Sequence, residues 1–208
     1  MGLHRTLLST LSAAVLINPA LPACSTVTPQ VLHVPLTARS WSVLQEGSSS
    51  EKPNIRFMRQ EGFPQGEMVI KSGAARLDGL IFRDGTIDFD MKSTAEDIPG
   101  LKFRQQGELG QDNAEEFYVR TFPDCRVSND GIQYTPVING FMLWNVYPQY
   151  QTRAPILEGW NHFKLVVSGR RLNVFVNGAH EPALAVGELE SSSLEGSLEF
   201  RGPAAFAN

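Results

Sequence analysis

The 208-residue sequence has few charged residues, cysteines and histidines, and each shortage argues against a class of function. Charged residues make up 19% of the chain and the formal net charge is -4, so no broad basic surface is available for nucleic acid. Two cysteines and four scattered histidines do not indicate a structural zinc site. We therefore expect neither a nucleic-acid-binding protein nor a protein organised around a metal.

The sequence also lacks helical periodicity and internal repeats. Apolar residues do not recur at helical spacing, and no repeat of solenoid or propeller period is present. The apolar stretch near the N-terminus, TLLSTLSAAVLI, is too short and too poorly flanked to span a membrane. Thirteen prolines and eighteen glycines divide the chain into many short segments instead. This punctuation predicts an all-β domain, and 42% hydrophobic content is enough for one core.

The N-terminus has the organisation of an export signal. A short basic start, MGLHR, precedes the apolar stretch, which NPALPAC then interrupts with two prolines. We expect residues 1–23 to be a signal peptide, residues 24–34 a linker and residues 35–208 a single domain. The protein is therefore expected to be exported, to the periplasm or cell envelope or, alternatively, as a secreted protein.

The two cysteines leave two alternatives open. The sequence LPAC ending at Cys24 resembles a bacterial lipobox, in which that cysteine is acylated and anchors the protein to the membrane, although Pro22 departs from the pattern. Cys125 would then be unpaired. Plain cleavage after Ala23 would instead permit a Cys24–Cys125 disulfide in an oxidising compartment.

Aromatic rings, charged groups and amides are densest between Glu115 and Tyr147. Alternation within EEFYVRT predicts a strand with two different faces. One face carries Phe117, Val119 and Thr121, and the other carries Glu116, Tyr118 and Arg120. A second strand candidate, IQYTPVI, follows a turn-rich gap. Rings that stack on sugar C–H faces, beside groups that bond hydroxyls, indicate a saccharide ligand.

Other segments also alternate in the manner of strands. TIDFDMKS gives the clearest pattern, with Asp88 and Asp90 outward, and LKFRQQ is expected to place Lys102 and Arg104 on one side. VLHVPL, SWSVLQ, IRFMRQ, EMVIKSG, ARLDGLIF and EGSLEFRG are further strand candidates. HFKLVVS, a GR turn and RLNVFVN form a hairpin pattern. About ten short, half-polar strands favour a sandwich of two antiparallel sheets.

The order of these motifs resembles the concanavalin A-like lectin/glucanase superfamily over roughly residues 35 to 205. The segment from Trp160 to Gly178 is similar to one common to laminin-G-like modules. The pairing of FYVR with QYTPVINGFMLW resembles bacterial exported domains of the 3-keto-disaccharide hydrolase type. The resemblance implies a jelly-roll sandwich whose ligand lies on the concave face of one sheet. It does not fix an activity, because one scaffold hosts sugar binders, glycosidases and adhesive modules.

The outward residues of the clearest strands, with the nearby rings, make up the predicted substrate site. Glu116 is the candidate acid or base, and the candidate binding residues are Asp88, Asp90, Arg104, Tyr118, Arg120, Gln133, Trp144 and Tyr147. Each has a structural alternative: Glu116 and Arg120 would serve equally as a charge-balanced surface, and Trp144 within FMLW fits a core position better than a platform. His162 and His180 have no evident partner and receive no catalytic role.

Asp88 and Asp90 resemble the spaced carboxylates of glycoside hydrolase family 16, but Ser93 stands where that pattern has its third acid. Calcium is implied only by analogy with many members of the superfamily, because no loop here has clear ligand spacing. The sequence therefore predicts an exported domain that binds or processes a saccharide, with glycoside hydrolysis open. The alternative is a laminin-G-like binding or adhesive module of the cell envelope.

Overall fold

The computed structural model describes residues 30–45, 51–108, 110–124, 127–153 and 155–208. The expected signal peptide and both cysteines lie outside these ranges, as do the predicted cleavage, lipidation and disulfide. The chain divides into a unit of residues 1–32 and a unit of residues 33–208, and the fold below is that of the second unit. Within the described ranges, no helix is long and apolar enough to cross a membrane.

The described residues contain fifteen strands and one turn of 3-10 helix, η1 (Pro148–Tyr150). The strands are β1 (Trp41–Leu44), β2 (Asn54–Gln60), β3 (Phe63–Ser72), β4 (Ala74–Leu77), β5 (Gly85–Ser93), β6 (Gly100–Gln106), β7 (Asn113–Val119), β8 (Ile132–Ile138), β9 (Phe141–Met142), β10 (Gln151–Thr152), β11 (Asn161–Ser168), β12 (Arg171–Val176), β13 (Leu184–Val186), β14 (Ser197–Arg201) and β15 (Ala204–Ala207).

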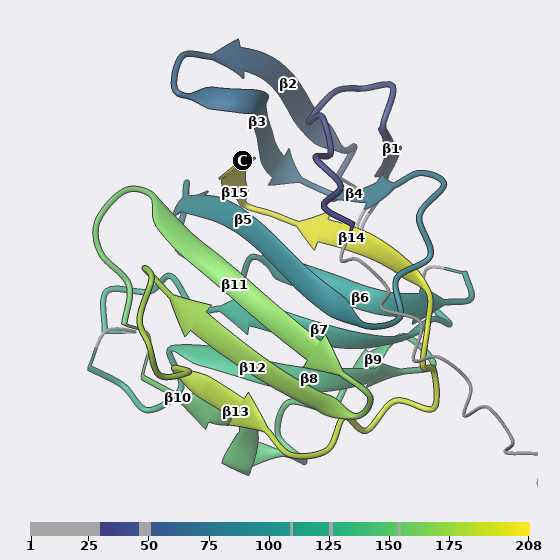
Figure 1. The fold of residues 1–208 in the computed structure, drawn as a ribbon, viewed down its shortest axis with the longest axis vertical. Helices are drawn as coiled ribbons and strands as arrows, with labels where there is room; N and C mark the ends of the chain where they lie inside the picture. The colour runs from purple at the N-terminus through teal and green to yellow at the C-terminus, as the bar shows by residue number, and fades with distance from the viewer. Residues whose placement is uncertain (1–29, 46–50, 109, 125–126, 154) are drawn as a thin grey trace, which may run out of the picture. The chain divides into compact units, whose positions relative to one another are not determined.

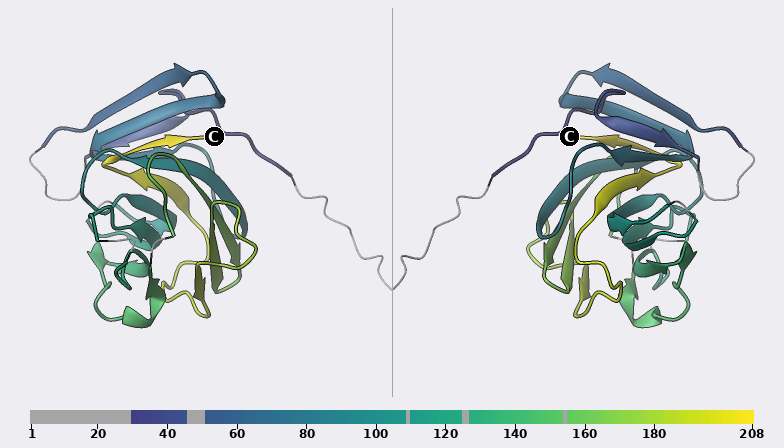
Figure 2. Two further views of the ribbon diagram at one scale, coloured as in Figure 1. Left: turned by 90° about the vertical axis from the view of Figure 1, so that its left-hand side faces the viewer. Right: turned by 90° about the vertical axis from the view of Figure 1, so that its right-hand side faces the viewer.

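The strands form two antiparallel sheets that lie face to face (Figures 1 and 2). The eight-stranded sheet has the order β1-β4-β14-β6-β7-β8-β10, with β9 also paired to β8. The seven-stranded sheet has the order β13-β12-β11-β5-β15-β3-β2. The all-β, two-sheet sandwich expected from the sequence is therefore confirmed.

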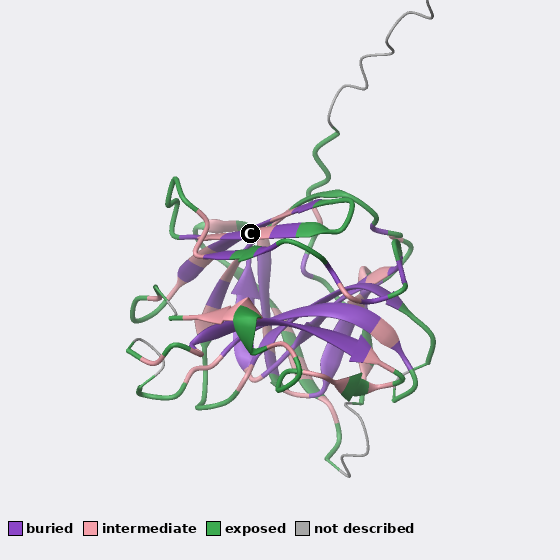
Figure 3. Ribbon diagram, turned by 90° about the horizontal axis from the view of Figure 1, so that it is seen from below, coloured by how far each residue is buried: buried purple, intermediate pink, exposed green. Residues whose placement is uncertain are grey.

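The core lies between the sheets and follows from alternation along each strand. Phe117 of β7 contacts Phe163 of β11 with ring centroids 5.7 Å apart, and Phe89 of β5 contacts Phe200 of β14 at 5.0 Å. These contacts fix which face of each strand is inward. Seen from below, the strands are largely buried and most exposed residues lie in the surrounding loops (Figure 3).

Most predicted strands match observed ones, and the exceptions are spread along the chain. TIDFDMKS is β5, IQYTPVI is β8, and the predicted hairpin is β11 and β12. VLHVPL is not a strand, and ARLDGLIF forms only the short β4 before it turns. The sequence analysis did not assign β9, β10, β13 or β15. The sequence AAFA of β15 does not alternate apolar and polar residues, because it is buried on both faces between β5 and β3.

Candidate functional site

The outer face of the eight-stranded sheet, which points away from the seven-stranded sheet, carries two rows of polar residues. The inward direction of Phe117 sends its neighbours Glu116 and Tyr118 to this outer face. Cross-strand register gives the first row as Arg76, Glu199, Lys102, Glu116 and Thr135. It gives the second as Ala74, Arg201, Gly100, Tyr118, Gln133 and Gln151.

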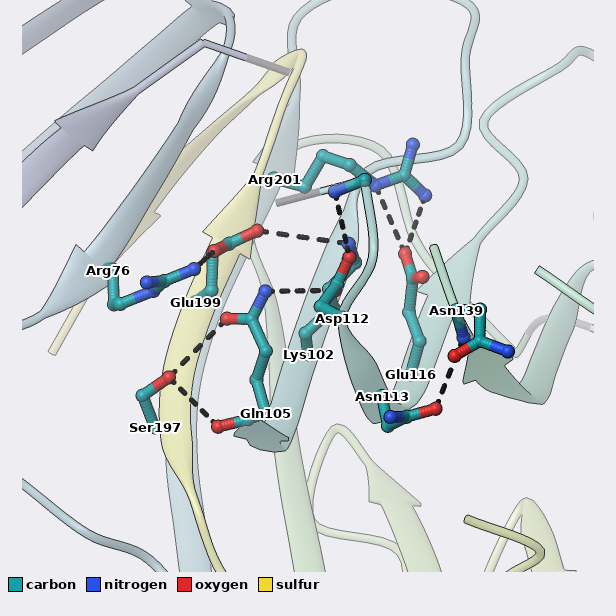
Figure 4. A network of polar contacts seen from close by, with 11 residues as sticks. Arg76, Lys102, Gln105, Asp112, Asn113, Glu116, Asn139, Ser197, Glu199 and Arg201 are labelled. Atoms are coloured by element: carbon teal, nitrogen blue, oxygen red, sulfur yellow. Dashed lines mark hydrogen bonds and ion pairs between the residues drawn. The ribbon is translucent and has the colours of Figure 1, made fainter. Parts of the chain in front are cut away.

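Charges alternate in sign along the first row and pair with one another (Figure 4). An Arg76 nitrogen lies 3.1 Å from Glu199 Oε2, and Lys102 Nζ lies 4.0 Å from Glu199 Oε1. Lys102 Nζ also lies 3.2 Å from Asp112 Oδ2, which accepts a hydrogen bond from Gln105 at 2.9 Å. Asp112 lies in the loop before β7, and its carboxylate contacts Lys102 and Gln105. The row is thus a largely buried network of paired charges rather than an open surface.

The pKa values in this network reflect burial working against the paired charges. Burial lowers the pKa of Lys102, but Glu116, Glu199 and Asp112 together hold it above its usual value. Burial favours a protonated Asp112, yet Lys102 and the Gln105 hydrogen bond leave its pKa below normal. For Glu199, burial prevails over Lys102 and Arg76, and the pKa is raised. Lys102 therefore carries the charge that holds the network together.

Glu116 is fully buried and forms an ion pair with Arg201. Its Oε1 accepts hydrogen bonds from Arg201 Nε at 3.0 Å and from a terminal guanidinium nitrogen at 2.7 Å. Gly100 lies between the two strands that carry this pair, and a Cβ there would come within 2.4 Å of the Phe117 carbonyl oxygen. Gly100 therefore permits the close approach of β6 to Phe117 and Tyr118 of β7. Glu116 Oε2 is buried without a hydrogen-bond partner among the described residues.

Tyr118, Gln133 and Arg120 form a second cluster on the same face. Tyr118 donates to Gln133 Oε1 at 2.7 Å, and Arg120 donates to the same oxygen at 3.0 Å and to the Tyr118 hydroxyl at 3.2 Å. Burial raises the pKa of Tyr118 to about 12, so its phenol stays a neutral donor. The sequence analysis placed these three residues together on neighbouring strands, and in the structure they contact one another.

Trp144 extends this cluster to the surface. Gln133 donates its amide to the Trp144 carbonyl oxygen at 2.7 Å, which holds the segment between β9 and β10 over the face. The Arg120 guanidinium lies 5.3 Å from the Tyr118 ring centroid and 6.0 Å from that of Trp144. Trp144 is 49% exposed, so the interpretation as a core residue is wrong. Tyr147 instead stacks on Tyr150 at 6.3 Å.

Asp88 and Asp90 do not join this site. They lie on β5 of the seven-stranded sheet, facing outward as predicted, but on a different sheet from Glu116. Both contact His162 of β11: Nε2 lies 3.2 Å from Asp88 Oδ1, and Nδ1 lies 2.9 Å from Asp90 Oδ1. The sequence analysis left His162 without a partner, because the β5–β11 pairing is a long-range contact. The predicted set of nine residues is therefore divided between two sheets.

Arg104 is also placed differently from the expectation. It was expected to share a face with Lys102, but the register of β6 against β7 shifts between Phe103 and Gln106, and Arg104 has φ of +53°. Its side chain is 1% exposed and donates to the Arg83 and Gly169 carbonyl oxygens and to Asp84, at 2.7, 2.7 and 2.9 Å. Burial lowers the pKa of Arg104. This arginine ties β6 to the loops around the seven-stranded sheet.

Glu115 is a buried acid that the sequence analysis did not single out. It precedes Glu116 on β7 and therefore points inward, where it accepts from the Tyr134 hydroxyl at 2.6 Å and from the Ser191 amide at 3.2 Å. Burial raises the pKa of Glu115 to about 7, although Tyr134 and Arg104 act in the opposite direction. The sequence did contain a signal for it: position 115 lies on the same strand face as the apolar Phe117 and Val119, so an acid there was expected to point into the core.

We predict that Glu115 makes folding stability fall as the pH rises. The folded carboxyl stays protonated up to a pKa of about 7, while the unfolded one ionises near 4.5. Its contribution is complete below about pH 4.5 and is lost between there and about pH 7, on the order of 3 kcal/mol in total. Melting temperatures measured from pH 4.5 to 8 should fall less steeply for Glu115→Gln than for the unchanged protein. Parallel profiles would contradict the assignment.

In the described part of the chain, no group of three or more His, Cys, Asp or Glu residues has a geometry that could hold a metal ion. The side chains of this face offer guanidinium and amide groups, a phenol and an exposed indole.

The sequence matches no protein-family model and no curated protein sequence. Among solved structures, the chain is similar to carbohydrate-binding module CBM66 from Bacillus subtilis, with a TM-score of 0.54, 16% identity, and coverage of 81% of this chain and 92% of that chain. The chain has the concanavalin A-like lectin/glucanase fold. It is also similar to a β-glucanase from Bacillus licheniformis, with a TM-score of 0.45 and 11% identity over 83% of this chain and 80% of that one.

A galectin from Caenorhabditis elegans is similar as well, with a TM-score of 0.43, 14% identity and coverage of 82% and 96% of the two chains. At 16% identity, the likeness to CBM66 establishes the sandwich fold and nothing about ligands. The expected resemblance to this superfamily is thus confirmed at the level of fold. The closer relation to domains of the 3-keto-disaccharide hydrolase type stays a prediction.

Proposed function

We propose that residues 33–208 form a carbohydrate-binding domain in which Trp144 and Arg120 contact the saccharide, while the buried Tyr118 and Gln133 hold these two residues in position. The observation that carries the proposal is the indole of Trp144, which is 49% exposed beside the Arg120 guanidinium, 6.0 Å from the ring centroid. An exposed tryptophan offers a flat apolar surface for the C–H face of a sugar ring. The Arg120 guanidinium next to it supplies hydrogen-bond donors for hydroxyl groups.

The state of the carboxylates on this face supports binding rather than retaining hydrolysis. A retaining glycosidase needs two carboxyl groups about 5–5.5 Å apart that both reach the glycosidic bond. Glu116 and Glu199 are 0% and 1% exposed and are paired with arginines. Asp130 is partly exposed, but it lies 3.6 Å from Arg120 and is paired with it. Glu116 as an acid or base is therefore the weaker alternative.

The first test is a glycan array followed by calorimetry on the glycans that bind. Trp144→Ala is expected to weaken binding at least about tenfold, because the stacking surface is lost. Arg120→Lys is expected to weaken it as well, because lysine keeps the charge but not the planar fork. Phe141→Ala is the matched control: Phe141 is 72% exposed on the neighbouring β9 and belongs to no part of the cluster, so its removal should leave affinity unchanged.

The remaining outcomes separate the other functions. An array without any bound glycan would contradict the proposal and favour a laminin-G-like module that binds protein. Equal losses in Trp144→Ala and Phe141→Ala would place the ligand elsewhere. Release of shorter saccharides by the unchanged protein would identify a hydrolase.

We also infer that the protein is exported, to the periplasm or cell envelope. The basic start and the apolar stretch before residue 24 support this, and so does a saccharide ligand, since glycan polymers are abundant outside the cytoplasm. Mass spectrometry of the mature N-terminus would test it, because an acylated Cys24, a free N-terminus after Ala23 and an uncleaved chain differ in mass.

A further inference from the structure

The Arg120 guanidinium uses only part of its hydrogen-bonding capacity within the protein. Nη1 donates to the Asp130 carbonyl oxygen at 2.5 Å and to Gln133 Oε1 at 3.0 Å, and Nη2 donates to the Tyr118 hydroxyl at 3.2 Å. Gln133 Oε1 and the Tyr118 hydroxyl are themselves 2.7 Å apart. They therefore form one pair of acceptors that faces the two terminal nitrogens of the planar guanidinium.

The remaining donors of Arg120 lie together on one edge of the group. The N–H of Nε and the second N–H of Nη2 are side by side there, and neither has an acceptor among the described residues. Nε is not one of the buried polar atoms that lack a partner, so this edge reaches solvent, on a side chain that is 17% exposed. Two parallel N–H groups match the two oxygens of one carboxylate, which arginine binds in a bidentate manner.

The charge of Arg120 is also incompletely balanced. The acceptors of its hydrogen bonds are a carbonyl, an amide and a phenol oxygen, all of them neutral. Asp130 Oδ2 lies 3.6 Å from Nη1, beyond hydrogen-bonding distance, and Asp130 Oδ1 accepts from the Ser128 hydroxyl. The Asp130 side chain is 41% exposed, and an exposed ion pair of this length contributes little. An anion with better geometry can therefore compete with Asp130 for the guanidinium.

A second carboxylate close to the cluster does not oppose an anionic ligand. Glu116 lies on the same strand face as Tyr118 and Arg120, but it is fully buried and its Oε1 accepts two hydrogen bonds from Arg201. Its charge is thus compensated from the side of the sheet. The exposed part of the cluster consists of the Trp144 indole, the free edge of Arg120 and the weakly paired Asp130.

We propose that the saccharide is acidic and that Arg120 binds the carboxylate of a uronic acid residue through Nε and Nη2. The sugar ring stacks on the Trp144 indole, whose centroid is 6.0 Å from the guanidinium carbon. A uronic acid carries its carboxylate directly on the sugar ring, so one residue can reach both side chains. This inference rests on the proposed saccharide function and adds the chemical class of the ligand to it.

The test compares oligosaccharides of galacturonate, mannuronate, guluronate and glucuronate with their carboxyl-reduced forms by calorimetry. Reduction replaces each carboxylate with a hydroxymethyl group and keeps the sugar ring, so each pair of probes differs only at the proposed contact. At least one acid is expected to bind at least about tenfold more tightly than its reduced form, because two charge-assisted hydrogen bonds are lost on reduction. Trp144→Ala should weaken the binding of that acid as well.

Asp130→Asn distinguishes a carboxylate ligand from a neutral one. The amide keeps an acceptor for the Ser128 hydroxyl but removes the competing charge, so affinity for the acid should rise about two- to fivefold. A neutral sugar that donates a hydroxyl to Asp130 would instead bind this variant more weakly. Asp124→Asn is the matched control and should leave affinity unchanged, because Asp124 is exposed in the same β7–β8 connection and, among the described residues, makes no ion pair with Arg120.

The outcomes separate this inference from the saccharide proposal on which it rests. Equal affinity for every acid and its reduced form, preference for neutral or sulfated glycans, or weaker binding of the acid by Asp130→Asn would overturn the acidic class while the saccharide function stands. Unchanged affinity of the acid for Trp144→Ala would place it outside the proposed site and overturn the inference as well. An array without any bound glycan would overturn both.

Discussion

Glu116→Gln is expected to destabilise the protein by about 3 kcal/mol, and this loss of stability should account for its phenotype. Glu116 is fully buried, and its Oε1 accepts two hydrogen bonds from Arg201 at 3.0 and 2.7 Å. The substitution removes the charge that faces the Arg201 guanidinium in a medium of low polarity. It also removes one of the three carboxylates that keep the pKa of Lys102 high. The measurement is urea unfolding followed by tryptophan fluorescence.

A double variant makes this prediction specific to the pair. Arg201→Met should be destabilised by a similar amount, and the double variant with Glu116→Gln should lose less than the sum, by at least about 1 kcal/mol. Glu195→Gln is the surface control. That carboxylate is 49% exposed and pairs with Arg83, which is 64% exposed, so its loss should cost no more than about 0.5 kcal/mol.

The opposite result would revive the catalytic interpretation of Glu116. If Glu116→Gln unfolds at the same urea concentration as the unchanged protein but abolishes turnover of a glycan that the unchanged protein cleaves, the carboxylate acts on substrate. Unchanged stability together with unchanged glycan binding would show that neither role is correct.

Arg104→Ala is expected to cost about 3 kcal/mol or more without changing the affinity for glycans. The side chain is 1% exposed and donates to two carbonyl oxygens, those of Arg83 and Gly169, as well as to Asp84. Its removal leaves a void and deprives both carbonyl groups of their donor. Urea unfolding gives the cost, and calorimetry with a bound glycan shows whether affinity changes.

The backbone at this position provides a second comparison. Arg104 has φ of +53°, a region that glycine adopts without strain, so Arg104→Gly should be about 1 kcal/mol more stable than Arg104→Ala. Arg83→Ala controls for the loss of an arginine nearby at an exposed site and should change stability by no more than about 0.5 kcal/mol. A stable Arg104→Ala variant that no longer binds glycan would contradict this prediction and indicate that Arg104 contacts the ligand.

Alternation along the chain predicted the facing of most side chains correctly. Phe89 and Met91 point inward and Asp88 and Asp90 outward, because the buried side of a half-buried strand must be apolar every second residue. The same rule failed at Arg104, where an irregularity in the pairing of β6 with β7 shifts the register. Such a shift depends on the partner strand and leaves no mark in the alternation of LKFRQQ.

The candidate site was predicted in part for a related reason. Tyr118, Arg120 and Gln133 were placed together correctly because β7 and β8 are neighbours both in sequence and in the sheet. Asp88 and Asp90 were grouped with them wrongly, since alternation separates inward from outward but does not say which sheet a strand joins. Arg201, the partner of Glu116, lies 85 residues away along the chain and carried no local signal.

The sequence by itself determined the all-β class, most strand positions and the inward and outward faces, because these depend on local alternation and on turn residues. Only the tertiary structure decided which strands share a sheet, and with it the division of the predicted site. It also decided that Glu116 lies buried against Arg201 while Trp144 lies exposed beside Arg120. Those outcomes depend on long-range pairing and on the loops that close over the sheet, which no spacing within a single strand encodes.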